Sequence, residues 1–545
     1  MPSSKIDNST VYDLIGLGFG PANIAIDGVV IEKLTSTSSG SFPVKNVLFI
    51  EKHEKFRWHP GMLLPDARMQ ISFMKDLAAL RNPQSPITFV SYLHSQDRLA
   101  SFINRGSTVP SRKEYADYLA WAAQYVQDNG VDVLYSHEVV RLSRGPSDTV
   151  NVHSRDLLTG TERVIQARDI VISPGGAPRI PETLSSISDH PFVIHSSTFA
   201  TSIDPILKAL AGKSRPLRIA VVGSGQSAAE VTMNLRERLS LISCAESRHE
   251  VDMLIRKGSL KPSDDSPFSN EIFDPSSTET WFNTPTERIR QSRLAEYKST
   301  NYSVVNPRTI EQLHDIIYDQ RLDEGIAKRT ASAASSQPFI NILPYTSIIS
   351  ANTNTTPVSS SSDLTIVDAS QFSIITQDLI SRAISELKYD AVIYATGYQR
   401  TSWINLLKDS DIGKNFGLHA TSSAVQLLPS SRHPSRLDVN FNLNASVSNS
   451  GIPSPSSDSA CSTPPTSPEP FTFSSSGIDR HIPDVVYISR NYRLLPVQGN
   501  PEAPQFKSRV YLQGVEEATH GLSDTLLSVL GVRAGEVVND LSTRD

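Results

Sequence analysis

The residues whose types and spacing most directly indicate chemistry form two glycine-rich turns. The first reads Gly-Leu-Gly-Phe-Gly-Pro from Gly16 and follows a strand expected at Val11–Ile15. In such a turn one glycine permits the tight bend, another lets the backbone approach a pyrophosphate, and the next helix directs its N–H groups at the phosphates. Pro21 replaces the third glycine of the usual motif, and proline suits the first turn of a helix. We therefore predict a dinucleotide site that includes Gly16, Gly18, Gly20 and Asn23.

An acidic residue supports this interpretation. Glu51 ends the next expected strand, Val47–Ile50, where a carboxylate can bind the ribose hydroxyls of an adenosine. It lies further from the glycines than usual because Thr35–Pro43, rich in Ser, Thr and Gly, is expected to form a loop.

The second turn, Gly-Ser-Gly-Gln-Ser-Ala-Ala from Gly223, follows a strand expected at Arg218–Val222. The next strand, Val251–Ile255, ends in Arg256 rather than in an acid. A guanidinium matches a phosphate, whereas a carboxylate there would repel one, so NADPH is favoured over NADH. Two dinucleotide sites indicate a flavoprotein with FAD at the first site and NADPH at the second.

The two cysteines, Cys244 and Cys461, form no CxxC pair, which excludes disulfide-reductase chemistry and a Cys-based zinc ribbon. We predict no metal site, and oxygen is the expected electron acceptor of the reduced flavin. Two free thiols in a chain without an apolar signal segment fit a cytoplasmic protein. The net charge of −6 is mildly acidic and lacks the excess of positive charge that is typical of nucleic-acid-binding proteins. No apolar stretch reaches the ~18 residues that a membrane-spanning helix needs.

Short apolar runs such as Ile170–Ser173 and Ala391–Tyr394 alternate with helical segments, which predicts an α/β fold with parallel sheets. We expect two Rossmann-like dinucleotide-binding domains, for FAD and NADPH, plus a small, mostly helical substrate-binding region at about 270–330. The expected division is an FAD domain at 1–205 and 365–545, with the NADPH domain at 213–350 between its parts.

Two polar segments are predicted to lack regular structure. The first is Ala351–Ser362, and the second is an insertion at about 429–477 that includes Ser446–Ser476. The latter holds 12 Ser and 6 Pro in 31 residues, so it cannot bury enough apolar surface to offset its ordering entropy. A spacer is the favoured interpretation, and a phosphorylated loop is the alternative.

Several longer motifs occur in a specific order: Phe56-Arg-Trp-His, Met69-Gln-Ile-Ser-Phe-Met-Lys, Lys261-Pro-Ser-Asp-Asp-Ser-Pro-Phe-Ser-Asn-Glu, Thr300-Asn-Tyr-Ser, Ala395-Thr-Gly-Tyr and Ala518-Thr-His-Gly-Leu-Ser-Asp-Thr-Leu-Leu-Ser. Over about 11–425 and 478–538 the chain resembles the lysine N6-/L-ornithine N5-oxygenase family of flavin monooxygenases, and its fungal ornithine branch most closely. The resemblance implies N5-hydroxylation of L-ornithine with NADPH and O2 for hydroxamate siderophore biosynthesis, and a homotetramer. It assigns the chemistry to the oxygenated flavin and names no catalytic side chain.

The resemblance also implies three sets of contacts. Those to FAD are Glu51, Lys52, Trp58, His59, Gln70, Thr525, Leu526 and Leu527. Those to NADPH are Ser224, Gly225, Gln226, Ser227, Arg256, Asn301, Tyr302 and Ser303. Those to the substrate are Lys75, Asn270, Glu271, Ile272, Phe273, Asn301 and Ser528.

The chemistry of these side chains suits an amino acid. Lys75 can neutralise a carboxylate, and Asn270 offers an acceptor to an ammonium group. Ser523–Thr525 is expected to begin a helix whose N–H groups face the flavin. Plainer interpretations remain: Lys75 as a surface lysine beside Asp76, or Ser528 bonding its own helix backbone.

Other functions stay open at this point. An L-lysine N6-hydroxylase would share these motifs, and a non-catalytic FAD-binding redox sensor would share the glycine turns. A carbon- or sulfur-oxidising flavin monooxygenase is disfavoured, because around His195 only part of the FxGxxxHxxxF pattern is present.

Overall fold

The computed structural model describes residues 10–36, 42–213, 215–243, 248–333, 335–353, 371–421, 424–432, 483–497 and 506–543. Its first unit is built on a seven-stranded sheet in the order β3-β2-β1-β6-β5-β4, with β20 paired to β6. The strands around β1 are parallel, whereas β5 runs antiparallel to both β4 and β6. The bounds are β1 Val11–Leu17, β2 Val47–Ile50, β3 Asp132–Leu134, β4 His137–Arg144, β5 Val150–Asp156, β6 Glu162–Ile172 and β20 Val510–Leu512.

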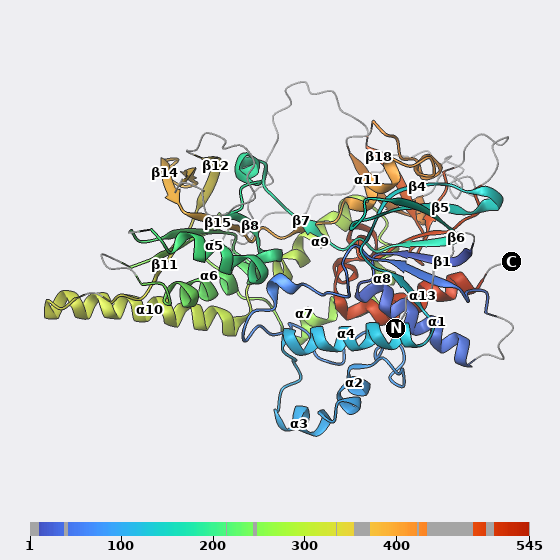
Figure 1. Ribbon diagram of the computed structural model, residues 1–545, viewed down its shortest axis with the longest axis horizontal. Coiled ribbons are helices and arrows are strands. Elements are labelled where there is room, and N and C mark those ends of the chain that lie inside the picture. Colours follow the sequence, from blue (N-terminus) through green and yellow to red (C-terminus); the bar gives the residue numbers. More distant parts are fainter. Residues whose placement is uncertain are drawn as a thin grey trace, which may run out of the picture.

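Both faces of this sheet are covered, which explains why β2 is a continuous apolar run and why β1 is buried and largely apolar apart from Asp13. Leu14 and Phe49 point to a layer formed by α1, α4 and α13. Ile15 and Leu48 point the other way, to α11 and to a small sheet of β17, β18 and β19 (Figure 1). The bounds are α1 Pro21–Ser36, α4 Arg112–Asp128, α13 Leu530–Ser542, α11 Ser402–Lys408, β17 Val425–Pro429, β18 Asp484–Ile488 and β19 Leu494–Leu495.

The second unit is built on a five-stranded parallel sheet in the order β11-β10-β9-β15-β8. It shares one core with α5, α6 and an antiparallel sheet of β12, β13 and β14. The bounds are β8 Val193–His195, β9 Arg218–Val222, β10 Glu250–Leu254, β11 Phe339–Leu343, β15 Ala391–Tyr394, α5 Phe199–Leu210, α6 Gln226–Leu239, β12 Thr346–Thr353, β13 Phe372–Asp378 and β14 Ile384–Tyr389.

The strand pairing differs from the division expected from the sequence. β8 lies within 1–205 and β15 within 365–545, yet both pair in the second sheet. The second unit therefore takes chain from both sides of the 213–350 segment. The two-residue strands β7 (Ala177–Pro178) and β16 (Tyr398–Gln399) pair with each other next to these crossings between the units.

Four helices follow β10, in the region expected to be helical at about 270–330. α8 (Ser277–Phe282) and α9 (Glu287–Asn301) contact residues 517–525 of the first unit, and α7 (Pro267–Glu271) precedes them. The fourth helix, α10 (Pro307–Thr330), packs on α6 and extends past the second unit (Figure 1). No helix in the described part of the chain is long and apolar enough to span a bilayer.

Three loop predictions need correction at their edges. Thr35 and Ser36, expected in the Thr35–Pro43 loop, are the last two residues of α1. Residues 351–353 are the end of β12, where Ala351 is buried against the second core. Residue 429 ends β17, which pairs with β18, and 430–432 form a short 3₁₀ helix, so the first four positions of the predicted insertion have regular structure. Residues 354–362 and 433–477 lie outside the described residues.

The short helix α12 (Glu517–His520) carries a buried histidine that gives the fold a pH dependence. His520 stacks on Tyr492 and lies 3.2 Å from the Arg490 carbonyl oxygen through Nε2. Burial lowers the pKa of His520 to about 4, below the ordinary value near 6.5. The folded state thus keeps this imidazole neutral while the unfolded state binds a proton. We expect stability to be full above pH 6.5 and to fall by about 3 kcal/mol as the pH drops to 4.

The His520→Gln variant tests this expectation through the slope of unfolding free energy against pH. Denaturant titrations between pH 7 and 5 should give a flatter slope for the variant than for the wild type. The exposed His94, replaced in the same way, is the control, and equal slopes for all three proteins would contradict the prediction.

Candidate functional site

The first glycine turn lies at the carboxyl end of β1, where α1 begins. A Cβ on Gly16 would lie 2.1 Å from the Phe49 ring, and Gly18 adopts a φ of +90° with the Ser173 carbonyl beside it. Both positions therefore require glycine. Nothing lies within 4 Å of a Cβ built on Gly20, so the backbone there is open to a ligand. This cradle fits a pyrophosphate.

Asn23 and Glu51 hold the turn in shape. The Asn23 amide donates to the Gly18 carbonyl at 2.6 Å and accepts from the Ser173 hydroxyl at 3.0 Å. The Glu51 carboxylate accepts from the Phe19 and His53 backbone N–H groups at 2.9 and 3.0 Å. A carboxylate has about four acceptor sites, so Glu51 retains capacity for ribose hydroxyls, whereas the Asn23 side chain serves the turn itself.

The second turn lies at the equivalent end of β9. Gly223 has a φ of +144° and its Cβ would lie 2.4 Å from the Ala395 carbonyl oxygen. Ser303 packs over the turn, with its hydroxyl 2.7 Å from that of Ser224 and its carbonyl accepting from the Lys257 ammonium at 3.0 Å. Arg256 lies beside this cluster after β10 and is exposed.

Between the units lies a cavity of about 280 Å³ in which the three predicted sets of contacts meet. Of the residues predicted for FAD, it is lined by Trp58, His59, Gln70, Leu526 and Leu527. Of those predicted for NADPH and the substrate, it is lined by Ser227, Asn301, Lys75, Asn270, Phe273 and Ser528. These side chains come from segments up to about 470 positions apart in sequence, so the fold brings them together.

Lys75 is presented to the cavity rather than paired with its neighbour. The Asp76 carboxylate is buried and accepts from the backbone N–H groups of Ala78, Ala79 and Phe89 at 2.6 to 2.8 Å. Burial raises the pKa of Asp76 from its ordinary value. Asp76 therefore serves the backbone rather than Lys75, and the role of Lys75 in substrate binding stays a prediction.

Asn270 and Ser528 offer polar atoms on other walls of the same cavity. The Asn270 amide nitrogen donates to the Asp265 carbonyl at 3.0 Å, so the amide oxygen is the group presented as an acceptor. Ser528 is 2% exposed, and its hydroxyl has no hydrogen-bond partner among the described residues. It does not bond its own helix backbone, and an orphaned hydroxyl at a cavity wall is suited to a ligand.

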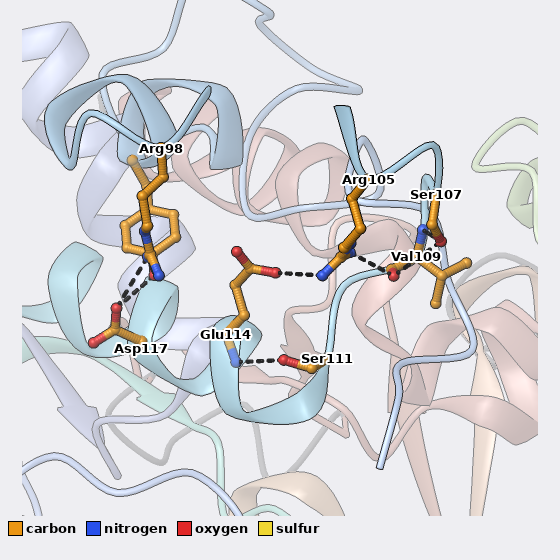
Figure 2. A network of polar contacts seen from close by, with 8 residues as sticks. Arg98, Arg105, Ser107, Val109, Ser111, Glu114 and Asp117 are labelled. Atoms are coloured by element: carbon orange, nitrogen blue, oxygen red, sulfur yellow. Dashed lines mark hydrogen bonds and ion pairs between the residues drawn. The ribbon is translucent and has the colours of Figure 1, made fainter. Parts of the chain in front are cut away.

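The segment that carries Gln70 and Lys75 is backed by a network that Figure 2 shows. Arg105, which follows α3 (Leu99–Asn104), bonds Glu114 on α4 at 3.3 Å and the Val109 carbonyl at 3.0 Å. Residues 108–110 in turn accept backbone hydrogen bonds from Met69 and Phe73. Arg98, which follows α2 (Phe89–Ser95), bonds Asp117, which also lies on α4. These contacts fix the cavity wall against α4.

Some predicted residues lie elsewhere. Glu271, Ile272, Tyr302 and Ser303 do not line the cavity. Ser303 lies at the second turn, whereas the Tyr302 hydroxyl bonds Glu517. The Gln226 amide bonds inside the protein: its nitrogen donates to Glu230 and Thr309, and its oxygen accepts from the Asn306 N–H. Ser523–Thr525 does not begin an α-helix: Leu522–Thr525 is a single 3₁₀ turn, and α13 starts at Leu530.

Sequence reasoning missed the ion pair that joins the two units. Arg112 on α4 and Glu230 on α6 form two hydrogen bonds of 2.7 and 2.9 Å, and both side chains are largely buried. Arg112 lines the cavity, and burial, together with the Arg112 charge, keeps the pKa of His59 below its ordinary value. No local signal identifies such a pair, because its members are 118 positions apart.

A buried ionic cluster underlies the cavity wall formed by 526–528. Arg533 of α13, Asp524 and Glu516 are each no more than 2% exposed. Burial alone would raise the pKa of Asp524, but the Arg533 guanidinium holds it below its ordinary value. Burial, together with the Asp524 charge, raises the pKa of Glu516 well above its ordinary value. These opposite shifts make Asp524 the carboxylate that pairs with Arg533 and favour the protonated form of Glu516.

The fold and the cavity define a class of α/β protein with two glycine turns that each fit a dinucleotide. Similarity to known proteins identifies the family. Residues 10–400 match the model of the L-lysine 6-monooxygenase/L-ornithine 5-monooxygenase family. The L-ornithine N(5)-monooxygenase of Coprinopsis cinerea is 55% identical, with 98% of each chain covered. This chain therefore belongs to the L-lysine 6-monooxygenase/L-ornithine 5-monooxygenase family.

Solved structures agree with this assignment. The ornithine hydroxylase of Pseudomonas aeruginosa matches with a TM-score of 0.69 at 31% identity, covering 98% of this chain and 99% of that one. The Kutzneria sp. 744 ornithine N-hydroxylase, solved with reduced FAD, NADP⁺ and L-ornithine, matches with a TM-score of 0.68 at 26% identity, covering 98% of this chain and 99% of the other.

Proposed function

We propose that this chain is an FAD- and NADPH-dependent L-ornithine N5-monooxygenase. It uses NADPH and O2 to convert L-ornithine into N5-hydroxy-L-ornithine for hydroxamate siderophore biosynthesis. One observation carries the proposal: a single cavity is lined by residues matched to flavin, nicotinamide and amino-acid contacts. Relatives between 48% and 55% identical over nearly the whole chain are named L-ornithine N(5)-monooxygenases, which supports ornithine over lysine.

FAD, when bound, supplies oxygen activation, with NADPH as its reductant. The glycine turns at Gly16 and Gly223 would hold the two pyrophosphates. The chain itself then has to bind and orient the amino acid. The Lys75 ammonium would bind the substrate carboxylate, and the Asn270 amide oxygen would accept from the α-ammonium.

The Ser528 hydroxyl gains a partner when the site fills, which removes the penalty of an unsatisfied buried group. The apolar side chains of Leu526, Leu527 and Met69 exclude water from the reacting amine.

A product assay tests this function. Protein purified with added FAD is given NADPH and O2 with either L-ornithine or L-lysine, and the hydroxylated amino acid is quantified. We expect product from ornithine and little from lysine. Product from lysine instead would show that the substrate is L-lysine rather than L-ornithine. NADPH oxidation without product from either amino acid would overturn the proposal. NADPH consumption alone does not suffice, because it also reports uncoupled peroxide release.

The assignment of Arg256 predicts a selective loss. Arg256→Ala removes the guanidinium proposed to bind the 2′-phosphate. We expect kcat/KM for NADPH to fall roughly 30-fold, which corresponds to about 2 kcal/mol of lost binding free energy. The value for NADH should change little, because NADH lacks that phosphate. Steady-state kinetics with both nucleotides give the comparison, and Arg57→Ala, on the first unit, is the control. Equal losses for both nucleotides would reject the role.

We also propose a homotetramer and a cytoplasmic location. The tetramer rests on the resemblance of the sequence motifs to the family, and the location on a sequence with only two cysteines, which fits a reducing compartment. Sedimentation of the purified protein and fractionation of cells test them separately.

A further inference from the structure

The helix α10 presents two different faces. Its inner face packs on the second unit through Leu313, which is 1% exposed, and through Gln320, whose amide exchanges hydrogen bonds of 3.0 and 3.2 Å with the Ile340 backbone of β11. These contacts fix the rotation of the helix about its axis. The opposite face therefore points away from the protein.

That outer face carries large apolar side chains. Tyr318, Leu322 and Ile326 are 58%, 48% and 38% exposed. At about 100° per residue, Tyr318 and Ile326 lie about 40° to either side of Leu322, whereas Gln320 and Leu313 lie about 160° and 180° away. The three side chains thus form one stripe of apolar surface, which is typical of an interaction site.

Charged residues close the stripe at both ends with opposite signs. Asp315 precedes Tyr318 by three positions, and Arg329 follows Ile326 by three positions. Both are exposed and lie within about 20° of Leu322 around the helix. Neither has an ion-pair partner among the described residues. The order acid, Tyr, Leu, Ile, base has the spacing 3-4-4-3, which is symmetric about Leu322.

This symmetry determines the partner that the stripe fits. When two copies of α10 pack antiparallel about a two-fold axis through Leu322, each residue meets the one equally far on the other side of the centre. Tyr318 then meets Ile326, Asp315 meets Arg329, and Leu322 meets itself, with every contact made twice. Such self-complementarity is the property of an isologous interface.

We infer that the outer face of α10 is an interface with a second copy of this chain, formed by an antiparallel α10 pair centred on Leu322. A parallel pair would place Asp315 against Asp315 and Arg329 against Arg329, so the charges select the antiparallel arrangement. The pair also covers residues 321–330, three turns of helix that otherwise extend into solvent with little support.

A charge exchange tests the interface with its own internal control. Asp315→Arg places like charges opposite Arg329 of the second copy, and Arg329→Asp places like charges opposite its Asp315. Each single variant should halve the mass of the FAD-loaded protein in sedimentation velocity at low micromolar concentration. The double variant restores opposite charges and should recover the wild-type mass. Far-UV circular dichroism verifies that α10 still folds in all three.

Crosslinking locates the axis. In L322C the two introduced thiols face each other, so mild oxidation should give a covalent dimer, whereas I103C, on α3 and even more exposed than Leu322, should not. The wild type reports any background from Cys244 and Cys461. A monomeric wild type, single charge variants with unchanged mass, or a double variant that stays dissociated would overturn the proposal.

Discussion

Replacing Asp524 with asparagine is expected to lower the free energy of unfolding by about 3 kcal/mol. The substitution keeps the shape of the side chain but leaves the Arg533 guanidinium buried without its counter-charge, and breaking a buried pair in this way costs about 3–5 kcal/mol. Arg533 also donates to the Asp524 carbonyl, so its displacement should disturb the 522–529 segment. Denaturant titration measures the loss, and the KM for ornithine should rise because Ser528 lies at the end of that segment.

The matched control lies within the same cluster. Glu516→Gln replaces a carboxyl group that already carries a proton, so the neutral amide should cost less than about 1 kcal/mol at pH 7. The two variants differ from the wild type by the same chemical change at adjacent buried sites. If Glu516→Gln were as damaging as Asp524→Asn, Glu516 would be ionised and the description of the cluster would be wrong.

Lys75→Met is expected to lower kcat/KM for L-ornithine by about 2 kcal/mol, or roughly 30-fold, mainly through KM. The Lys75 ammonium is presented to the cavity, and methionine preserves the apolar stem while removing the charge. The estimate is at the lower end of the range for charged pairs because Lys75 is only half-buried. Steady-state product formation at saturating NADPH gives both constants.

A substrate without a carboxylate separates this role from a general disturbance. 1,4-Diaminobutane has the same amine spacing as ornithine but offers nothing for Lys75 to bind. The wild type should discriminate strongly between the two substrates, and Lys75→Met should lose most of that discrimination. If the variant lost activity on both substrates equally, Lys75 would not be the carboxylate partner.

The apolar strands could be predicted from sequence because burial on both faces leaves a continuous signal. Val47–Ile50, Arg218–Val222 and Ala391–Tyr394 have the bounds in the structure that the sequence indicated. Sheet membership could not be predicted in the same way. The Ala391–Tyr394 strand is apolar throughout and would suit the centre of either sheet, so local composition does not show that it pairs with β9.

The same distinction, between local sequence features and contacts of distant segments, applies to the residues of the candidate site. The glycine turns are local, so their position and their need for glycine follow from sequence and agree with the geometry at Gly16, Gly18 and Gly223. Lys75, Asn270 and Ser528 were suggested only by resemblance, since each has an ordinary structural interpretation. Arg112 and Glu230 were not suggested at all, because an ion pair between two helices leaves no periodic signal.

The order in which the ribosome delivers the strands has a consequence for synthesis of this protein. β6 cannot receive its neighbour β20, nor α1 its neighbour α13, until the last part of the chain emerges. At ~5–20 residues per second, the interval between β6 and β20 is roughly 20–70 s. All strands of the second unit have been synthesised well before then. The second unit can therefore fold while the first sheet still lacks β20 and its covering helix α13, which leaves apolar surface of that sheet exposed. Nascent chains stalled before 510 should therefore bind chaperones that recognise apolar surface, and release should require the final helix.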